Sequence, residues 1–354
     1  MSEVLYSDTI AALATAPGLG SIAIIRISGP NSGLFLQKLT KKSNFKPRYA
    51  TKTSVYDQES GEIIDNLIVT YFPSPNSYTG ENLAEISAHG GLAIVRQILA
   101  QLYLLGAREA KPGEFTKRAV LNGKMDLNQA EAVLDLIHAK TALYKNNALK
   151  ILGGDLSTSI HKIHHSLKEL AITLEYELDF SEDEINQLSQ KKIEHEIEYS
   201  LKALQKLAES HKHGKALRDG INVAIVGAPN VGKSSLLNRI LHEQRALVSE
   251  IPGTTRDYII GEFEHKGLLF NLIDTAGIRD SEDPLEKLGI QYTYKHIDEA
   301  NIILFMTDVL DKNPGESLIN SLKNLDNKTI IILQNKSDLD HQYHSPSTVL
   351  GLSL

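Results

Sequence analysis

The chain has 354 residues, of which 42% are hydrophobic and 23% charged, a composition typical of a globular protein with two or three domains. It carries 37 Lys and Arg residues against 44 Asp and Glu, and the net charge of −7 argues against a basic protein that coats nucleic acid. The absence of Cys excludes disulfides, a thiol nucleophile and thiolate metal sites from this chain. No apolar run approaches the ~18 residues of a membrane span, and the first residues lack the positive charge of a secretory signal. We therefore expect a cytoplasmic protein with no membrane partner, which begins directly with folded structure.

The first segment, residues 1–122, has short apolar runs separated by turn residues. The runs at 8–15 and 21–28 flank a glycine-rich turn and predict two strands, and 63–72 predicts another. Residues 90–105 have the apolar spacing of a helix. This pattern predicts an α/β domain large enough to bury its own core.

The second segment, residues 123–215, is helical in character and nearly free of Pro. Apolar stripes run along 127–151, 156–174 and 184–210, and their steps of three and four residues predict one helix for each. Long helices with apolar stripes pack against one another, so the sequence predicts a central helical bundle.

A capping pattern marks the start of the first of these helices. Asp126 and Gln129 are three residues apart, so each side chain can bond the other's backbone amide. Gly153 and Gly154 are expected to end the same helix.

The third segment, residues 216–354, returns to alternating strands and helices. Continuous apolar runs at 221–226, 268–273, 302–307 and 329–334 are typical of strands buried on both faces. Such strands with helices between them predict a mostly parallel sheet.

A phosphate-binding pattern follows the first of these strands. Residues 227–234 read GAPNVGKS and match G-x-x-x-x-G-K-S, between a strand and a helix predicted at 235–241. Inward-facing backbone amides and the helix N-terminus bind phosphate oxygens. Lys233 adds a charge at the β- and γ-phosphates, and the Ser234 hydroxyl ligates Mg²⁺.

Two further patterns complete a nucleotide site. Asp274, Thr275, Ala276 and Gly277 end the strand at 268–273; the carboxylate suits a water-bridged Mg²⁺ and the glycine the γ-phosphate. The sequence Asn335-Lys336-Ser337-Asp338 follows the strand at 329–334. The Asp338 carboxylate can accept from both N1–H and the 2-amino group of guanine, which adenine cannot match. In this order, the motifs predict a P-loop GTPase domain.

A polar segment between these motifs, residues 253–257, reads GTTRD. A Thr in this position can bind Mg²⁺ and sense the γ-phosphate, as in a switch I loop; the alternative is a plain polar loop.

One residue expected of a Ras-like enzyme is absent. Such enzymes place a Gln directly after the D-x-x-G motif to orient the attacking water, and here that position is Ile278. The nearby polar candidates are Arg279, Glu282, Asp283 and Glu286, and spacing alone does not choose among them.

With these motifs, the chain resembles the tRNA-modification GTPase family MnmE, also called TrmE, over essentially all 354 residues. Besides the GTP-binding motifs, the resemblance is carried by IIRISG at 24–29, YTGE at 78–81, HGG at 89–91, KPGEFT at 111–116 and LNGK at 121–124.

The resemblance implies a three-part protein. Residues 1–122 would form a folate-binding-like domain that holds a 5-formyltetrahydrofolate-like donor and forms a homodimer. Residues 123–215 would be the first half of a helical domain, and 216–354 a GTPase domain cut short at its C-terminal end, because the family continues with further helices and a Cys motif. The family acts with an FAD-containing partner, MnmG, as a heterotetramer. It places a carboxymethylaminomethyl-type group on C5 of the wobble uridine of certain tRNAs. Its GTP hydrolysis is stimulated by K⁺ as the GTPase domains dimerise.

The resemblance also implies roles for single residues. In the folate site they are Arg26, Glu85 and Lys124, although an ordinary ion pair is the alternative for the first two. Glu286 would position the water and act in catalysis with Lys233. The K⁺ ligands would be Asn230, Ser249, Ile251 and Thr254, and the Mg²⁺ ligands Ser234 and Thr255. The GTP contacts would be Asn230, Val231, Gly232, Lys233, Ser234, Ser235, Ser249, Thr254, Thr255, Asp274, Thr275, Ala276, Gly277, Asn335, Lys336 and Asp338.

A rival hypothesis is a regulatory GTP-binding switch in ribosome or RNA assembly that performs no modification, and folate binding would discriminate against it. A small basic cluster, Lys41, Lys42, Lys46 and Arg48, lies in a predicted loop. From sequence alone we interpret it as solvated surface rather than a tRNA contact.

Overall fold

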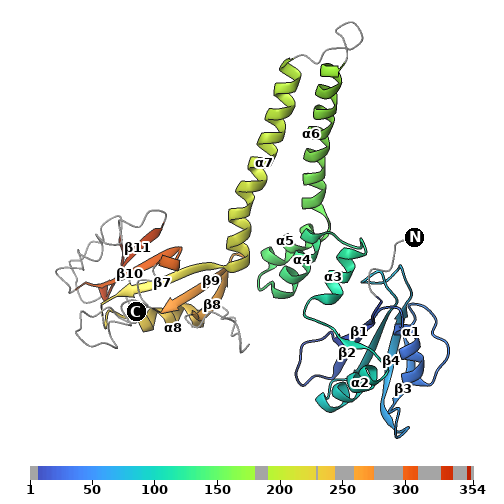
Figure 1. Cartoon of the computed structure of the whole chain (residues 1–354). Helices are drawn as coiled ribbons and strands as arrows, with labels where there is room; N and C mark the ends of the chain where they lie inside the picture. Colours follow the sequence, from blue (N-terminus) through green and yellow to red (C-terminus); the bar gives the residue numbers. More distant parts are fainter. Residues whose placement is uncertain are drawn as a thin grey trace, which may run out of the picture. The chain divides into compact units, whose positions relative to one another are not determined.

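The structure is a computed structural model that describes residues 7–179, 190–228, 230–243, 259–274, 298–309, 328–337 and 349–351 (Figure 1). The chain divides into two compact units, one of residues 1–133 with 152–157 and one of residues 134–151 with 158–354. In the described ranges, no helix has the length and apolarity needed to span a membrane.

The first unit is built on a six-stranded sheet among the described residues. Its strands are β1 Ile10–Leu13, β2 Ile22–Ser28, β3 Thr51–Tyr56, β4 Ile63–Phe72, β5 Leu83–His89 and β6 Arg108–Glu109. They lie in the order β3-β4-β5-β2-β1-β6 and pair antiparallel, except for the parallel pair of β1 with β6. The predicted strands at 8–15, 21–28 and 63–72 are confirmed.

One face of this sheet carries the core of the unit. Helices α1 Ser32–Thr40 and α2 Leu92–Leu104 pack on it against inward-facing residues such as Ile25 and Ile86. Because side chains alternate along a strand, the neighbouring Arg26 and Glu85 point to the other face. The helix predicted at 90–105 is confirmed, and α3 Glu114–Leu121 follows it.

The capping pattern is confirmed at the start of α4 Leu127–His138. The backbone amide of Asp126 donates to Gln129 Oε1 at 2.9 Å, and the amide of Gln129 donates to Asp126 Oδ1 at 2.9 Å. These two bonds satisfy amides that an open helix end leaves without partners.

The prediction of one continuous helix over 127–151 is wrong, because α4 ends at His138 and α5 Ala142–Leu152 begins anew. Thr141 provides the physical reason. Its hydroxyl accepts from the amide of Tyr144 at 3.2 Å, and its carbonyl accepts from the amide of Lys145 at 3.0 Å. Threonine at an N-cap starts a helix well, and the apolar spacing runs on unchanged across this break.

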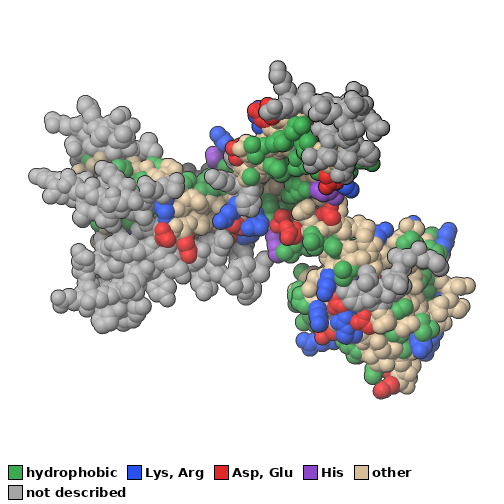
Figure 2. Space-filling model, turned by 45° about the horizontal axis from the view of Figure 1, so that its top comes forward, with side chains coloured by type: hydrophobic (Ala, Val, Ile, Leu, Met, Phe, Trp, Pro, Cys, Tyr) green, Lys and Arg blue, Asp and Glu red, His purple; other side chains and the backbone are tan. Residues whose placement is uncertain are grey.

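The two long helices are α6 Asp155–Asp179 and α7 Gln190–Asp219. The helix predicted at 156–174 is confirmed, and α7 runs nine residues past the predicted end at 210. Figure 2 shows hydrophobic side chains at the surface of these helices, and they include Ile160, Leu167, Ile197 and Leu204. The helical bundle therefore stays a prediction.

The second unit carries another six-stranded sheet among its described residues. The strands are β7 Ile221–Gly227, β8 Ile259–His265, β9 Leu268–Asp274, β10 Ile302–Asp308, β11 Thr329–Asn335 and β12 Val349–Gly351. They lie in the order β12-β11-β10-β7-β9-β8, and only β8 pairs antiparallel. The four predicted strands and the mostly parallel sheet are confirmed.

Both faces of this sheet are buried, as the continuous apolar runs predicted. Val223 and Ile225 of β7 belong to a core cluster with Leu236 of α8 Lys233–Glu243. Ala224 and Val226 belong to a separate cluster on the opposite face. Helix α8 confirms the helix predicted at 235–241.

Candidate functional site

The phosphate-binding pattern lies between β7 and α8, as its sequence context requires. Asn230 has a φ of 61° and Gly232 a φ of 103°, so the loop turns sharply through the left-handed region. The carbonyl of Gly232 accepts from the amide of Leu236 at 3.0 Å, which closes the first turn of the helix. The loop therefore leads directly into the N-terminus of α8, where backbone amides and the helix dipole favour the binding of a phosphate.

Lys233 is held inside this loop. Its ammonium donates to the carbonyls of Gly227 at 2.8 Å and Ala228 at 2.9 Å. These two hydrogen bonds keep its charge within the loop. A P-loop lysine in this position binds the β- and γ-phosphates. Ser234 and Ser235 follow in the first turn of α8 and are exposed.

Asn335 connects the end of β11 to the same loop. Its Nδ2 donates to the carbonyl of Val231 at 2.8 Å, and the residue is only 3% exposed. A Cβ at Gly232 would lie 2.2 Å from that nitrogen, so only a glycine fits there. The structure thus brings two of the predicted motifs into direct contact, although 104 residues separate them.

Lys336, the next residue, lies in the left-handed region with a φ of 60°. Its ammonium makes an ion pair with Asp308 at the end of β10. The pair ties the side chain of Lys336 to the end of the neighbouring strand β10.

Several predicted site residues lie outside the described residues. They are Ser249, Ile251, Thr254, Thr255, Thr275, Ala276, Gly277, Glu286 and Asp338. Asp274 ends β9, next to the phosphate-binding strand β7 in the sheet.

In the first unit, Arg26 of β2 and Glu85 of β5 face each other across the sheet. Arg26 donates from Nε at 3.0 Å and from Nη2 at 2.7 Å, both to Glu85 Oε1. The rings of Tyr78 and Phe115 lie 5.0 and 5.6 Å from the guanidinium carbon. The sequence analysis did not single out these rings, which lie within cation–π distance of the guanidinium.

Lys124 is placed differently. Its ammonium donates to the carbonyl of Pro75 at 3.1 Å, and its side chain lies against Gly80. Within the described part of the chain, it makes no hydrogen bond or ion pair to Arg26 or Glu85.

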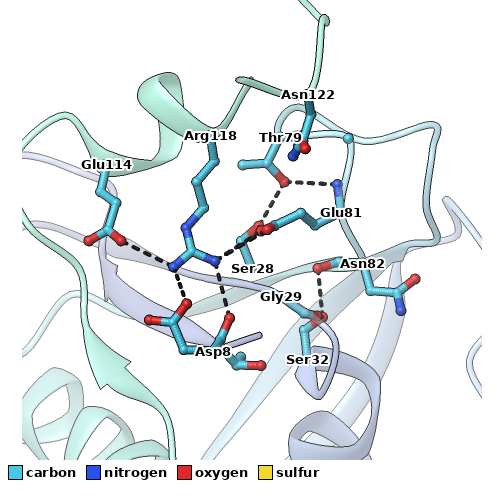
Figure 3. Close-up of polar contacts among 12 residues, drawn as sticks. Asp8, Ser28, Gly29, Ser32, Thr79, Glu81, Asn82, Glu114, Arg118 and Asn122 are labelled. Atoms are coloured by element: carbon cyan, nitrogen blue, oxygen red, sulfur yellow. Dashed lines mark hydrogen bonds and ion pairs between the residues drawn. The ribbon is translucent and has the colours of Figure 1, made fainter. Parts of the chain in front are cut away.

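A buried charge cluster in the same unit was missed by the sequence analysis (Figure 3). Arg118 is fully buried and bonds three carboxylates: Asp8 at 2.8 Å, Glu114 at 3.1 Å and Glu81 at 3.2 Å. Arg108 bonds Asp8 at 2.8 Å and Glu114 at 2.6 Å. The spacing of Glu114 and Arg118 on one helix was a sequence signal for this cluster, but it gives no hint of burial.

This cluster fixes loop 78–81, which carries Tyr78. Ser28 Oγ donates to Glu81 Oε2 at 2.7 Å and lies 2.7 Å from Thr79 Oγ1. Asn122 Nδ2 donates to the carbonyl of Thr79 at 2.7 Å. Loop 78–81 is therefore tied to β2 and to the end of α3.

Two carboxylates of the cluster, Asp8 and Glu114, are held in their charged form. The hydrogen bond from Arg108 lowers the pKa of Glu114 to about 2, against the opposing effect of its burial. Burial alone would raise the pKa of Asp8, but the hydrogen bond from Arg108 and the charge of Arg118 outweigh it and lower that pKa.

Comparisons with known proteins match both units. Residues 9–124 match the family model "GTP-binding protein TrmE N-terminus", and residues 222–336 match "50S ribosome-binding GTPase". The chain is 45% identical over 339 residues to the tRNA modification GTPase MnmE of Caldicellulosiruptor saccharolyticus, covering 94% of this chain and 73% of that protein. It is 41% identical over 333 residues to the MnmE of Aquifex aeolicus, covering 94% of this chain and 74% of that protein.

Among solved structures, the G domain of the T. maritima FeoB iron transporter is 27% identical, with a TM-score of 0.28 over 38% of this chain and 86% of that chain. A score this low supports no conclusion, and the two MnmE relatives decide the assignment. The chain belongs to the tRNA modification GTPase MnmE family.

Proposed function

We propose that this chain is a GTP hydrolase that acts in the modification of tRNA. The observation that carries the proposal is the contact of Asn335 with the carbonyl of Val231, because it joins the N-K-x-D motif to the phosphate loop. That contact supports guanine and triphosphate recognition at one sheet edge, as GTPase chemistry requires. Membership of the MnmE family points to tRNA rather than to the ribosome.

The residues present suit GTP with Mg²⁺. The loop at 227–234 leads into the N-terminus of α8, which begins at Lys233. Ser234 follows in the first turn with a hydroxyl that suits the metal. Thr255 would supply the second Mg²⁺ ligand. Asp338 would select guanine, since its carboxylate accepts two donors that adenine lacks.

Hydrolysis would rest on a monovalent cation and a carboxylate. Ile278 takes the position of the usual water-orienting Gln. K⁺ held by Asn230, Ser249, Ile251 and Thr254 would supply the charge that an arginine finger gives elsewhere, worth ~10³–10⁵ in rate. Asn230 is exposed in a left-handed turn, so its side chain is accessible to such an ion. Glu286 would align the water.

The first unit would hold the one-carbon donor. Glu85 can accept two N–H groups from a pterin edge, and Arg26 and Lys124 can neutralise the anionic glutamate tail. The domains proposed are 1–122 for folate and homodimerisation, 123–215 for the first helical half, and 216–354 for GTP. With MnmG as the FAD-containing partner, the product would be a carboxymethylaminomethyl-type group on C5 of the wobble uridine, made in the cytoplasm.

The proposed mechanism of GTP hydrolysis is tested by measuring GTP turnover in K⁺ and in Na⁺. We expect faster turnover in K⁺ at nearly unchanged GTP affinity, and loss of that acceleration in Asn230→Ala. Glu286→Ala should reduce turnover without weakening GTP binding. Equal rates in the two salts would overturn the cation mechanism.

The folate arm is tested by titrating tetrahydrofolate into Arg26→Ala, Glu85→Ala and Lys124→Ala variants. Each should bind folate more weakly and GTP as before. If the unaltered chain binds GTP but no folate, the regulatory-switch hypothesis gains over the modification hypothesis.

A further inference from the structure

A single loop of the first unit concentrates positive charge. Residues 41–50, here called the basic loop, carry Lys41, Lys42, Lys46 and Arg48, and no Asp or Glu occurs between Asp8 and Asp57. The chain as a whole has a net charge of −7. Along the sequence, this charge is therefore separate from carboxylates, which next occur in the turn at 57–62 that Lys41 approaches.

The four cations of the basic loop are exposed and unneutralised. All four side chains are solvent-exposed, and none makes an ion pair within the described residues. Arg48 donates from Nη2 to the carbonyl of Asn76 at 2.7 Å, a bond that leaves its charge uncompensated. The loop thus presents a net positive potential between α1 and the edge strand β3.

Aromatic rings hold three of these lysines in place. The ammonium of Lys41 lies 4.2 Å from the ring centre of Tyr56, that of Lys42 lies 5.9 Å from Phe45, and that of Lys46 lies 5.2 Å from Tyr49. The Tyr49 ring is itself exposed, with 57% of the residue accessible. Basic side chains interleaved with an accessible aromatic ring suit single-stranded RNA, whose phosphates bind cations and whose bases stack on rings.

The backbone conformation of the loop does not account for Lys41 and Arg48. Lys41 has a φ of 54° and Arg48 a φ of 58°, a conformation in which Gly or Asn is favoured. A cation after the last turn of α1 is favourable to the helix dipole, which accounts for Lys41 alone.

We propose that the basic loop binds the phosphate backbone of the tRNA substrate, with Tyr49 stacking on an unpaired base. The proposal rests on the proposed function for the identity of the RNA. The sequence alone favoured a solvated cluster. The structure adds three observations: the four cations make no ion pair with any described residue, three of them contact aromatic rings, and Tyr49 is exposed.

The test measures binding of an unmodified tRNA transcript to the full chain by fluorescence anisotropy at several salt concentrations. The triple variant Lys41→Gln, Lys42→Gln, Lys46→Gln should bind at least tenfold more weakly at 0.1 M salt. Its plot of log affinity against log salt should be shallower by about two to three, since each lost phosphate contact removes roughly one from the slope.

A matched control removes three exposed cations elsewhere in the same unit: Arg96→Gln, Lys111→Gln, Lys117→Gln. It should keep most of the affinity and the slope. Tyr49→Ala should weaken binding with an unchanged slope. Lys41→Gly should weaken binding without lowering the melting temperature, because glycine suits its backbone.

Three results would overturn the proposal: no tRNA binding by the unaltered chain, equal losses in the two triple variants, or equal competition by a DNA duplex with the same number of phosphates. None of them bears on GTP turnover or folate titration, so the proposed function is judged separately.

Discussion

Arg118 shows how a buried charge can be structural. Its guanidinium is fully buried among Asp8, Glu81 and Glu114. Arg118→Met would leave these carboxylates without their central cation, and breaking a buried pair in this way costs about 3–5 kcal/mol. We expect denaturant unfolding to show that loss.

The exposed Arg96 of α2 provides the comparison for that variant. Arg96→Met should change the free energy of unfolding by less than about 0.5 kcal/mol. If both substitutions have equal effects, the cluster contributes nothing specific.

Glu114 makes the stability of the first unit depend on pH. Its pKa falls from an ordinary value of 4.5 to about 2 on folding. A depressed pKa stabilises the folded state above pH 4.5, and that contribution disappears as the pH falls toward 2. We expect acid unfolding between these values, and a flatter pH profile in Glu114→Gln, measured by circular dichroism.

Gly232 tests the phosphate loop. Alanine there would be strained at a φ of 103° and would press on the buried Nδ2 of Asn335. Gly232→Ala should therefore lower GTP affinity at least tenfold in a titration. The control is Gly214→Ala in α7, where an added Cβ meets no atom within 4 Å, so GTP affinity should not change.

Among the elements, the break between α4 and α5 depends on one cap. Thr141→Ala removes the acceptor for the Tyr144 amide, and such caps are worth about 1 kcal/mol. Thermal unfolding of the second unit should report the loss. Thr141→Ser keeps the hydroxyl and should restore most of the stability.

The sequence predicts an element well when the interactions that form it are local along the chain. The strands β7, β9, β10 and β11 were predictable because their apolar runs are continuous. The break before Thr141 was not, since the apolar spacing continues through it.

The candidate site also has features that local sequence patterns predict and features that they do not. The phosphate loop is a local pattern and was predictable, including its strand and its helix. The contact of Asn335 with Val231, the rings of Tyr78 and Phe115 around Arg26, and the burial of Arg118 depend on tertiary packing that no short pattern records.

At the scale of the whole molecule, the proposed ligands belong to different units. Arg26 and Glu85 lie in residues 1–133, and the phosphate loop lies in residues 158–354. Calorimetry should resolve two unfolding transitions. Folate should raise the midpoint temperature of one, and a GTP analogue with Mg²⁺ should raise the midpoint temperature of the other. Ligand at 100 times its dissociation constant stabilises its unit by about 2.7 kcal/mol. A single transition raised by both ligands would contradict this independence.

The side-chain amide of Asn335 should also couple the binding of the guanosine part of a nucleotide to the binding of its phosphates. Its Nδ2 holds the carbonyl of Val231 in the phosphate loop, while its backbone leads directly into Lys336 and the end of the motif that is proposed to recognise guanine. Guanosine and pyrophosphate offered as separate molecules should therefore bind cooperatively, each ordering the backbone that the other needs. Asn335→Ala should reduce that synergy, so that occupancy by one fragment no longer improves the affinity for the other.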